Sequence, residues 1–462
     1  MRASLAEVIA SMAGARLTQD AAFEGVSTDS RKVAPGSLFV ALRGENFDAH
    51  DFLDQVAAAG AAAVVVERLP AGFALPAIVV PDTLAALGQI ANHWRRQYAI
   101  PVIGVTGSNG KTTVKEMISA ILAAAFGEQH RLATQGNLNN EIGVPLTLMR
   151  LDSAHRAAVI ELGMNHPGEI GRLAAIAAPT IGLVNNAQRE HQEFMHTVEA
   201  VARENGAVLA ALPDDGVAVY PGDDTYTGLW RGLAECRGDR RCITFGLTDQ
   251  CDVHAAYQAT DFGSILQVTG VLADEETFTV NLAAAGVHNV RNALAAVACA
   301  IGAGIGPEAI VRGLESFAPV GGRLQRKQAS CGATVIDDTY NANPDSVRAA
   351  IDVLAGYASP RVLVLGDMGE VGTQGQQFHE EIGAYAQSRG IDTVLATGDL
   401  ARHLAGSGAQ HFEQFDELLA ALDAKLGSKS DATVLVKGSR FMKMERVVQH
   451  LIGSQNTGKE AH

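Results

Sequence analysis

The sequence has 462 residues, with 36 lysines and arginines against 51 aspartates and glutamates, so the formal net charge at pH 7 is −15. So acidic a protein is poorly suited to holding a polyanion by counterion release, which argues against nucleic acids and anionic membranes as partners. At about 150 residues per domain the length predicts three domains, and 47% hydrophobic with 19% charged residues is ordinary for a globular protein.

The chain shows no pattern typical of a targeting or membrane segment. Residues 1–14 lack a basic start followed by a long apolar core, and no stretch approaches roughly 18 uninterrupted apolar residues. The five cysteines are odd in number and match no zinc-binding spacing. We therefore expect a cytoplasmic protein without membrane insertion, and a monomer.

The first predicted domain, residues 1–83, holds short apolar strands at 37–42, 61–66 and 77–80, separated by Gly and Pro. This pattern predicts a small α/β domain. A helix predicted over 84–98 leads into the next domain.

The second predicted domain, residues 84–318, opens with a short apolar run at 101–106, typical of a buried parallel strand. A Gly-rich turn and a helix over 112–125 follow, then strands at 157–162 and 181–185 with helical stretches between them. The alternation predicts a parallel sheet with helices on both faces. Residues 251–280 are richer in β-forming residues and suggest a small antiparallel addition, and a helix over 289–301 closes the domain.

The third predicted domain, residues 319–462, is a second α/β unit of Rossmann-like type. Its strands are predicted at 334–337, 361–365, 393–396 and 433–436, with helices between them. The polar tail at 454–462 is expected to be frayed.

The strongest chemical signal is TGSNGKTT over residues 106–113, placed between a predicted strand and a predicted helix. Gly107 and Gly110 let the backbone turn so that its N–H groups, with those of Ser108 and Asn109, face a phosphate. Lys111 would reach the β- and γ-phosphates, and the Thr112 hydroxyl would bind Mg²⁺. The usual first glycine of a phosphate loop is replaced by Val105, so a plain Gly-rich turn is the alternative.

Two further residues follow apolar runs at the expected carboxyl edge of the sheet, where ligands bind in parallel α/β proteins. Glu161 ends the run at 157–161 and is a candidate Mg²⁺ ligand; the alternative is a carboxylate that faces water. His191 follows the strand at 181–185 and is a candidate for a second metal or a phosphate oxygen. A lone histidine is more often structural.

Asparagines mark the start of the helix after Gly286. Asn292 is a candidate partner for an adenine edge, and Asn289 a candidate for orienting the loop. Ordinary helix capping is the alternative, because Asn caps helices often.

These motifs, in this order, resemble the Mur ligase family, whose phosphate loop begins T-G and so accounts for the displaced glycine. The resemblance covers nearly the whole chain in collinear order. It is carried by DSR at 29–31, PGSLFVA at 35–41, TQGNLNNEIGVPLTL at 134–148, ELGMNHPGEI at 161–170, DDTYNANPDS at 337–346, LGDMGE at 365–370 and VKGSR at 436–440.

Within the family, the long motifs resemble the members that join D-alanyl-D-alanine to UDP-N-acetylmuramoyl-tripeptide through an acyl phosphate. The resemblance implies ATP and Mg²⁺ as well as these two substrates. It implies a first domain that binds the UDP end of the substrate, a second that binds ATP and a third that closes over both.

The resemblance also implies roles for individual residues. Lys111, Glu161 and His191 would be catalytic, and Thr112, Glu161 and His191 would be the metal ligands. The ATP site would contain Gly107, Ser108, Asn109, Gly110, Lys111, Thr112, Thr113, Asn289 and Asn292, completed by Arg323 and Asp338 of the third domain. The substrate would contact Ser30, Arg31, Asn137 and Asn140.

Two departures from the family stand out. Relatives usually carry, on the helix after His191, a lysine whose carbamate bridges magnesium ions, but this chain has Asn205 there. Either a neutral amide with water replaces the bridge or another group does. Residues 188–190 read Gln-Arg-Glu, where relatives commonly have smaller side chains.

Other functions remain open at this point. Another Mur enzyme, a cyanophycin synthetase or a folylpolyglutamate synthase would share the central loop. From a different class, a nucleotide-switched binding protein without ligase chemistry would also explain the loop, and Asn205 gives that alternative some footing.

Overall fold

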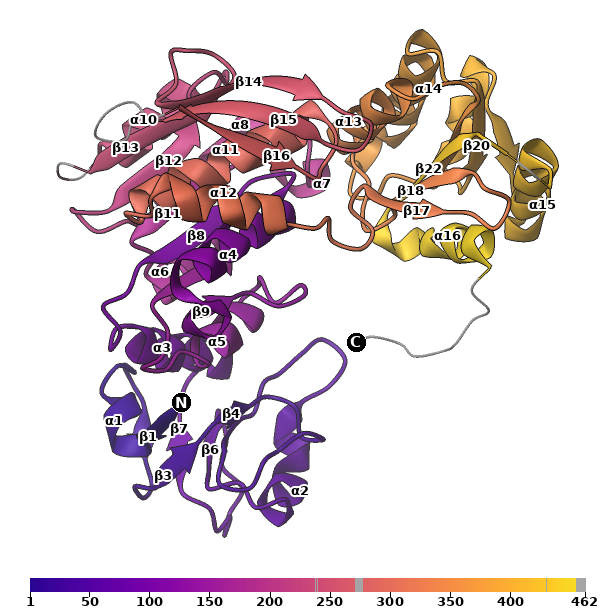
Figure 1. The fold of residues 1–462 in the computed structure, drawn as a ribbon. Coiled ribbons are helices and arrows are strands. Elements are labelled where there is room, and N and C mark those ends of the chain that lie inside the picture. The colour runs from indigo at the N-terminus through magenta and orange to yellow at the C-terminus, as the bar shows by residue number, and fades with distance from the viewer. Residues whose placement is uncertain (237, 239, 271–276, 429, 454–462) are drawn as a thin grey trace.

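A computed structural model describes residues 1–453 except 237, 239, 271–276 and 429, and the predicted frayed tail at 454–462 lies outside this part. Figure 1 shows three sheet-centred parts in chain order, coloured from indigo through magenta to yellow. The described residues form sheets of five, nine and six strands and one two-stranded sheet. The predicted α/β class with two larger α/β units and a small first unit is confirmed.

The five-stranded sheet belongs to the first part of the chain and has the order β2-β7-β6-β5-β4. Its strands are β2 (Arg16–Leu17), β4 (Val26–Ser27), β5 (Leu38–Val40), β6 (Ala63–Val66) and β7 (Ala77–Val79). All pairs are parallel except that of β2 with β7. One face packs on α2 (Leu53–Ala58), where Leu53 and Val56 join the buried side chains of β5 and β6.

The nine-stranded sheet has the order β16-β15-β14-β13-β12-β11-β8-β10-β9 in the described chain. The parallel strands are β8 (Val102–Thr106), β9 (Arg131–Ala133), β10 (Ala157–Glu161), β11 (Ile181–Val184), β12 (Val217–Pro221), β13 (Arg241–Gly246) and β14 (Val253–Ala259). The predicted antiparallel addition is β15 (Ser264–Gly270) and β16 (Thr277–Leu282), which extend the sheet from β14.

Helices cover both faces of this sheet, as predicted. On one face, α4 (Lys111–Phe126), α11 (Val287–Gly302) and α12 (Pro307–Ser316) bury Ile103, Val105 and Val159. On the other, α5 (Gly143–Leu148), α6 (Glu169–Ala177) and α9 (Ala207–Ala210) bury Val102 and Ile160. Successive side chains of a strand point to opposite faces, so the neighbouring residues Val102 and Ile103 lie in the cores on opposite faces of the sheet. The helix α3 (Thr83–Arg95) packs on α5 and α6 and connects this part to the first.

The six-stranded sheet forms the third part, in the order β17-β18-β22-β19-β20-β21. Its strands are β17 (Gln325–Gln328), β18 (Thr334–Asp338), β19 (Arg361–Leu365), β20 (Thr393–Thr397), β21 (Gln410–Phe412) and β22 (Thr433–Lys437). Among the described strands of this sheet, only the edge strand β17 is antiparallel. One face packs on α13 (Pro344–Ala355) and α14 (Gly375–Ser388), the other on α15 (Phe415–Leu426) and α16 (Glu445–Ile452).

The order β11-β8-β10 decides where the candidate site lies. Parallel pairing brings the carboxyl ends of these three strands to one edge, where Thr106 ends β8, Glu161 ends β10 and Asn185 directly follows β11. No helix among the described residues is long and apolar enough to cross a membrane. The domain boundaries at 83/84 and 318/319 stay predictions.

Candidate active site

The loop at 107–110 lies between the end of β8 and the first turn of α4. Gly110 precedes the helix with a φ of 79°, a conformation that favours glycine. A Cβ there would lie 2.5 Å from Asn292 Oδ1 and 2.9 Å from Asn185 Nδ2, so a larger residue would force a shift. The first turn of α4 lines a cavity and brings the positive end of the helix dipole to it, which suits an anion.

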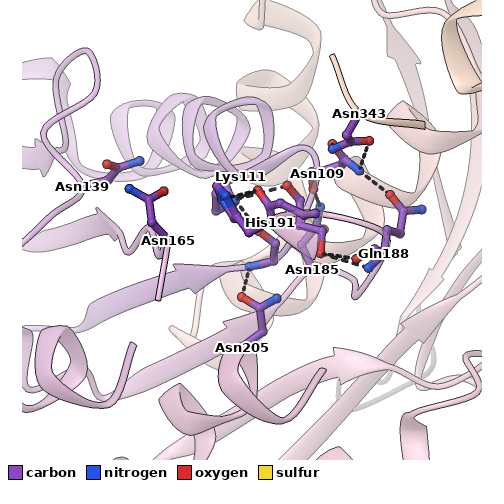
Figure 2. A network of polar contacts seen from close by, with 12 residues as sticks. Asn109, Lys111, Asn139, Asn165, Asn185, Gln188, His191, Asn205 and Asn343 are labelled. Atoms are coloured by element: carbon purple, nitrogen blue, oxygen red, sulfur yellow. Dashed lines mark hydrogen bonds and ion pairs between the residues drawn. The ribbon is translucent and has the colours of Figure 1, made fainter. Parts of the chain in front are cut away.

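The Lys111 ammonium is folded back over this loop (Figure 2). Its Nζ donates to the Gly107 carbonyl at 2.5 Å and to the Ser108 carbonyl at 3.2 Å, and it pairs with Glu190 Oε1 at 3.0 Å. All three partners are oxygen acceptors, so the oxygens of a phosphate can replace them without leaving the ammonium unpaired.

Glu161 ends β10 inside the protein, with 3% of its surface exposed. Its Oε1 accepts from Thr112 Oγ1 at 3.2 Å and from Asn139 Nδ2 at 3.0 Å. Its Oε2 is buried and has no hydrogen-bond partner among the described residues. A buried carboxylate oxygen without a donor is costly unless a cation or another donor occupies the space beside it.

The side-chain oxygen atoms of Glu161 and Thr112 are suitable ligands for Mg²⁺. This ion prefers oxygen ligands and is usually held by one or two carboxylates together with substrate phosphates, and both oxygens lie beside the phosphate loop in the same cavity. In the described chain, no group of three or more His, Cys, Asp and Glu side chains is arranged to hold a metal by itself.

His191 lies between two carboxylates. Its Nε2 is 3.5 Å from Glu190 Oε1, and its Nδ1 is 2.7 Å from Glu370 Oε2 of the third domain. Burial acts to lower the pKa of His191, but the two carboxylates outweigh it and raise the pKa to about 9. A protonated imidazole has no lone pair for a metal, so the predicted metal role requires His191 to lose this proton first. That role stays a prediction.

Asparagine side chains form a hydrogen-bonded network with the phosphate loop. Asn185 Nδ2 donates to the Asn109 carbonyl and to Asn292 Oδ1, both at 2.8 Å. Asn292 Nδ2 in turn donates to Asn289 Oδ1 at 3.1 Å. Asn289 and Asn292 therefore reach the predicted ATP site, where they are hydrogen-bonded to each other and Asn292 is also hydrogen-bonded to Asn185. The predicted contact of Asn292 with adenine stays a prediction.

The third domain contributes a buried ion pair to the same cavity. Lys437 Nζ donates to Asp338 Oδ2 at 2.6 Å and to the Asn341 carbonyl at 2.8 Å. Arg323 stacks its guanidinium over the Tyr340 ring, 4.1 Å from the centroid. The predicted residue Asp338 thus begins the loop at 338–343, which faces the phosphate loop. The predicted residue Arg323 lies over Tyr340 of the same loop.

One cavity of about 930 Å³ collects most of the predicted site. It is lined by Ser108, Asn109, Gly110, Lys111, Thr112, Thr113, Asn137, Asn140, Glu161, His191, Asn289, Asn292, Arg323 and Asp338. Three predicted residues are not in its lining. Gly107 is the first residue of the loop, and Ser30 and Arg31 lie in the first domain, where Arg31 is exposed and pairs with Asp29 at 2.9 Å. Asn140 also holds a local turn, because its Oδ1 accepts from the Gly143 N–H at 2.9 Å.

Asn205, at the end of α8 (Val198–Asn205), lies beneath the phosphate loop and not in the lining of the cavity. Its Oδ1 accepts from the Gly107 N–H at 3.0 Å, and its backbone carbonyl accepts from Thr106 Oγ1 at 3.1 Å (Figure 2). The side chain is 1% exposed. In this structure Asn205 therefore supports the loop.

The residue-by-residue predictions missed Lys437 and Glu190. Lys437 ends the buried strand β22, so the pattern that singled out Glu161, an apolar strand closed by a charge, also marks it. Glu190 has no comparable signal, because its contacts with Lys111 and His191 depend on how a loop folds back.

The chain is similar over nearly its whole length to known proteins. Models for the Mur ligase family, catalytic domain, the Mur ligase middle domain and the Mur ligase, glutamate ligase domain match residues 22–95, 105–300 and 322–440. The chain is 40% identical over 446 residues to the UDP-N-acetylmuramoyl-tripeptide–D-alanyl-D-alanine ligase of Escherichia coli, which covers 95% of each chain.

Solved structures give the same result. A crystal structure of MurF from Acinetobacter baumannii superposes with a TM-score of 0.91 at 34% identity, over 98% of this chain and 99% of that one. A MurF ligase from Thermotoga maritima in complex with ADP superposes with a TM-score of 0.83 at 25% identity, over 93% and 97%.

Proposed function

The chain belongs to the Mur ligase family, and we infer that it is the ATP-dependent ligase that joins D-alanyl-D-alanine to UDP-N-acetylmuramoyl-tripeptide in peptidoglycan synthesis. One structural observation carries the chemistry. The phosphate loop with Lys111 and the third-domain pair Asp338–Lys437 line the same cavity, so ATP and a carboxylate substrate can meet there.

The first step activates the carboxylate. A terminal carboxylate oxygen of the tripeptide attacks the γ-phosphorus of ATP, the bond to the β,γ-bridging oxygen breaks, and ADP leaves with that electron pair. Lys111 exchanges its carbonyl and carboxylate partners for phosphate oxygens and neutralises charge on the transferred group. The first turn of α4 holds the phosphates with its N–H groups.

The second step forms the amide. The amine of D-alanyl-D-alanine attacks the carbonyl carbon of the acyl phosphate, inorganic phosphate leaves, and the nitrogen gives up a proton. Water attacking the same carbon would waste the intermediate, so the cavity must stay closed between the steps. Because the lining comes from the central and third domains, their apposition provides this closure.

Mg²⁺, held by Glu161 and Thr112 together with phosphate oxygens, would supply additional charge neutralisation on the transferring phosphoryl group. We also propose the boundaries 1–83, 84–318 and 319–462 for the UDP-binding, ATP-binding and closing domains. Ser30 and Arg31 would serve the UDP end, and Asn137 and Asn140 the peptide. We propose as well that the protein is cytoplasmic and monomeric.

The test is phosphate release from ATP by the purified chain with Mg²⁺, UDP-N-acetylmuramoyl-tripeptide and D-alanyl-D-alanine, omitting each component in turn. Release that needs every component, with a pentapeptide product of the expected mass, establishes the ligase. Release with another amine acceptor but not with D-alanyl-D-alanine would indicate a different ligase. Nucleotide binding without release under any condition would favour the nucleotide-switched binding protein.

A further inference from the structure

The loop between β11 and α7 (Gln192–Met195) connects the phosphate loop to the third domain (Figure 2). Gln188 Oε1 accepts from Asn109 Nδ2 at 2.6 Å, and Glu190 pairs with Lys111 at 3.0 Å. Between these two residues, Arg189 points the other way, into the third domain. Residues 188–190, which depart from the family pattern, therefore contact both the phosphate loop and the third domain.

Arg189 makes a dense set of charged hydrogen bonds across the domain boundary. Its backbone N–H donates to Asp345 Oδ2 at 2.8 Å, and its Nη2 donates to Asp345 Oδ1 at 2.6 Å. Its Nη1 also donates to Glu381 Oε2 at 2.8 Å. The guanidinium lies 5.3 Å from the centre of the Phe378 ring. Such forked contacts to carboxylates fix orientation as well as distance.

Asp345 transmits this contact to the site. It stands in the first turn of α13, one loop away from Asp338 at the end of β18. The loop between them carries Tyr340, under Arg323, and Asn341, whose carbonyl accepts from Lys437. Anchoring the start of α13 therefore anchors the segment on which the third-domain side of the cavity is built.

A second contact holds the same helix start. Asn343, the N-cap of α13, donates from Nδ2 to Asn109 Oδ1 at 2.9 Å, and Asn109 belongs to the phosphate loop. Two neighbouring contacts, one charged and one neutral, thus join the start of α13 to the central domain.

We propose that Arg189 is a positioning residue for ligation, which holds the start of α13 so that Asp338, Arg323 and Lys437 face the nucleotide. Arg189 itself does not line the cavity and acts through Asp345. Because this role presupposes the ligase activity proposed above, its test has to separate the two.

The test compares the full-length chain with its Arg189→Ala, Arg189→Lys and Arg348→Ala variants. Arg348 is the matched control, because it pairs with the same Glu381 at 2.9 Å but lies on α13, within the third domain. Phosphate release with both substrates gives kcat and KM, calorimetry gives the affinity for ADP, and small-angle X-ray scattering gives the radius of gyration.

We expect Arg189→Ala to lower kcat by about 10- to 100-fold, since small misplacements of reacting groups cost that much. Its affinity for ADP should fall by much less than kcat, because the phosphate loop that holds the phosphates is intact, and its radius of gyration should rise. Arg189→Lys should recover part of kcat, because lysine keeps the charge and loses the fork. Arg348→Ala should stay within about twofold in all three measurements.

An Arg189→Ala kcat within twofold of the unaltered chain would overturn the role, and so would an equal loss in Arg348→Ala. If the unaltered chain releases no phosphate with its substrates, the proposed function fails instead. The scattering comparison then still decides whether Arg189 holds the third domain, and an unchanged radius of gyration would overturn that.

Discussion

Asn205 Oδ1 accepts a hydrogen bond from the Gly107 N–H at 3.0 Å, which ties α8 to the first residue of the phosphate loop. Relatives are expected to carry a metal-bridging lysine at the position of Asn205. Here Oδ1 is committed to the backbone of the loop, the buried Nδ2 has no partner among the described residues, and the side chain lies outside the cavity lining. Two carboxylates contact the first turn of α4 instead: Glu161, on β10, accepts from Thr112 Oγ1, and Glu190, on the loop after β11, pairs with Lys111.

Replacing Asn205 with Ala should weaken nucleotide binding. The change leaves the buried Gly107 N–H without its acceptor, which destabilises the native loop by about 1–3 kcal/mol. The Kd for ADP should rise by up to the corresponding factor of roughly 5 to 150, to the extent that the loop leaves its binding conformation. Calorimetry with ADP measures this. Arg203→Ala is the control, because Arg203 lies on the same helix but is exposed and pairs only with Glu199 in the described chain. Equal ADP affinity in both variants would contradict the support role.

Replacing Lys111 with Ala should abolish ligation while the fold survives. Removal of a preorganised donor to the transferring group costs at least about 10²-fold in rate, and among the described residues the ammonium hydrogen-bonds only to its own loop and Glu190. Phosphate release measures the rate, and far-ultraviolet circular dichroism with thermal unfolding checks the fold. Retained ligation in a folded variant would refute the assignment of the loop.

Breaking the Asp338–Lys437 pair should lower both stability and turnover. Removing one partner of a buried ion pair leaves an uncompensated charge, which costs about 3–5 kcal/mol, and Lys437 is 3% exposed. We expect Asp338→Ala to lower the denaturant midpoint and kcat together. Arg389→Ala is the control, because Arg389 pairs with Asp352 in the same domain, outside the cavity, and both side chains are well exposed. An equal loss in Arg389→Ala would show that the effect is not particular to the site.

Sequence reasoning located the parts of the site that are local. Strand, turn and helix around Lys111 follow one another within residues 102–126, and Glu161 is marked by its own strand. Arg189 and Glu190 could not be assigned this way, because their partners Asp345 and Lys111 lie 156 and 79 residues away in sequence. The Arg189–Asp345 contact forms only when two domains pack together, and the Glu190–Lys111 contact forms only when the loop after β11 folds back over the phosphate loop. No spacing within the chain encodes either contact.

Acidification should release the third domain through Glu381. Hydrogen bonds from Arg189 hold the pKa of Glu381 below its usual value of 4.5, against an opposing effect of burial. A carboxylate whose pKa is lowered by docking stabilises the docked arrangement fully above that usual value. Its contribution is lost as the pH falls through the lowered pKa. The radius of gyration should therefore stay constant from pH 7 to about pH 5 and rise below it.

Glu381→Gln separates this effect from general acid unfolding. The amide is neutral at every pH and pairs only weakly with Arg189 and Arg348, so this variant should be expanded already at pH 7 and should lose part of the acid step. Circular dichroism recorded on the same samples shows whether secondary structure persists while the radius changes. An identical pH profile in the variant and the unaltered chain would mean that Glu381 does not control docking. The contact between Arg189 and Asp345 would then be the one that holds the third domain.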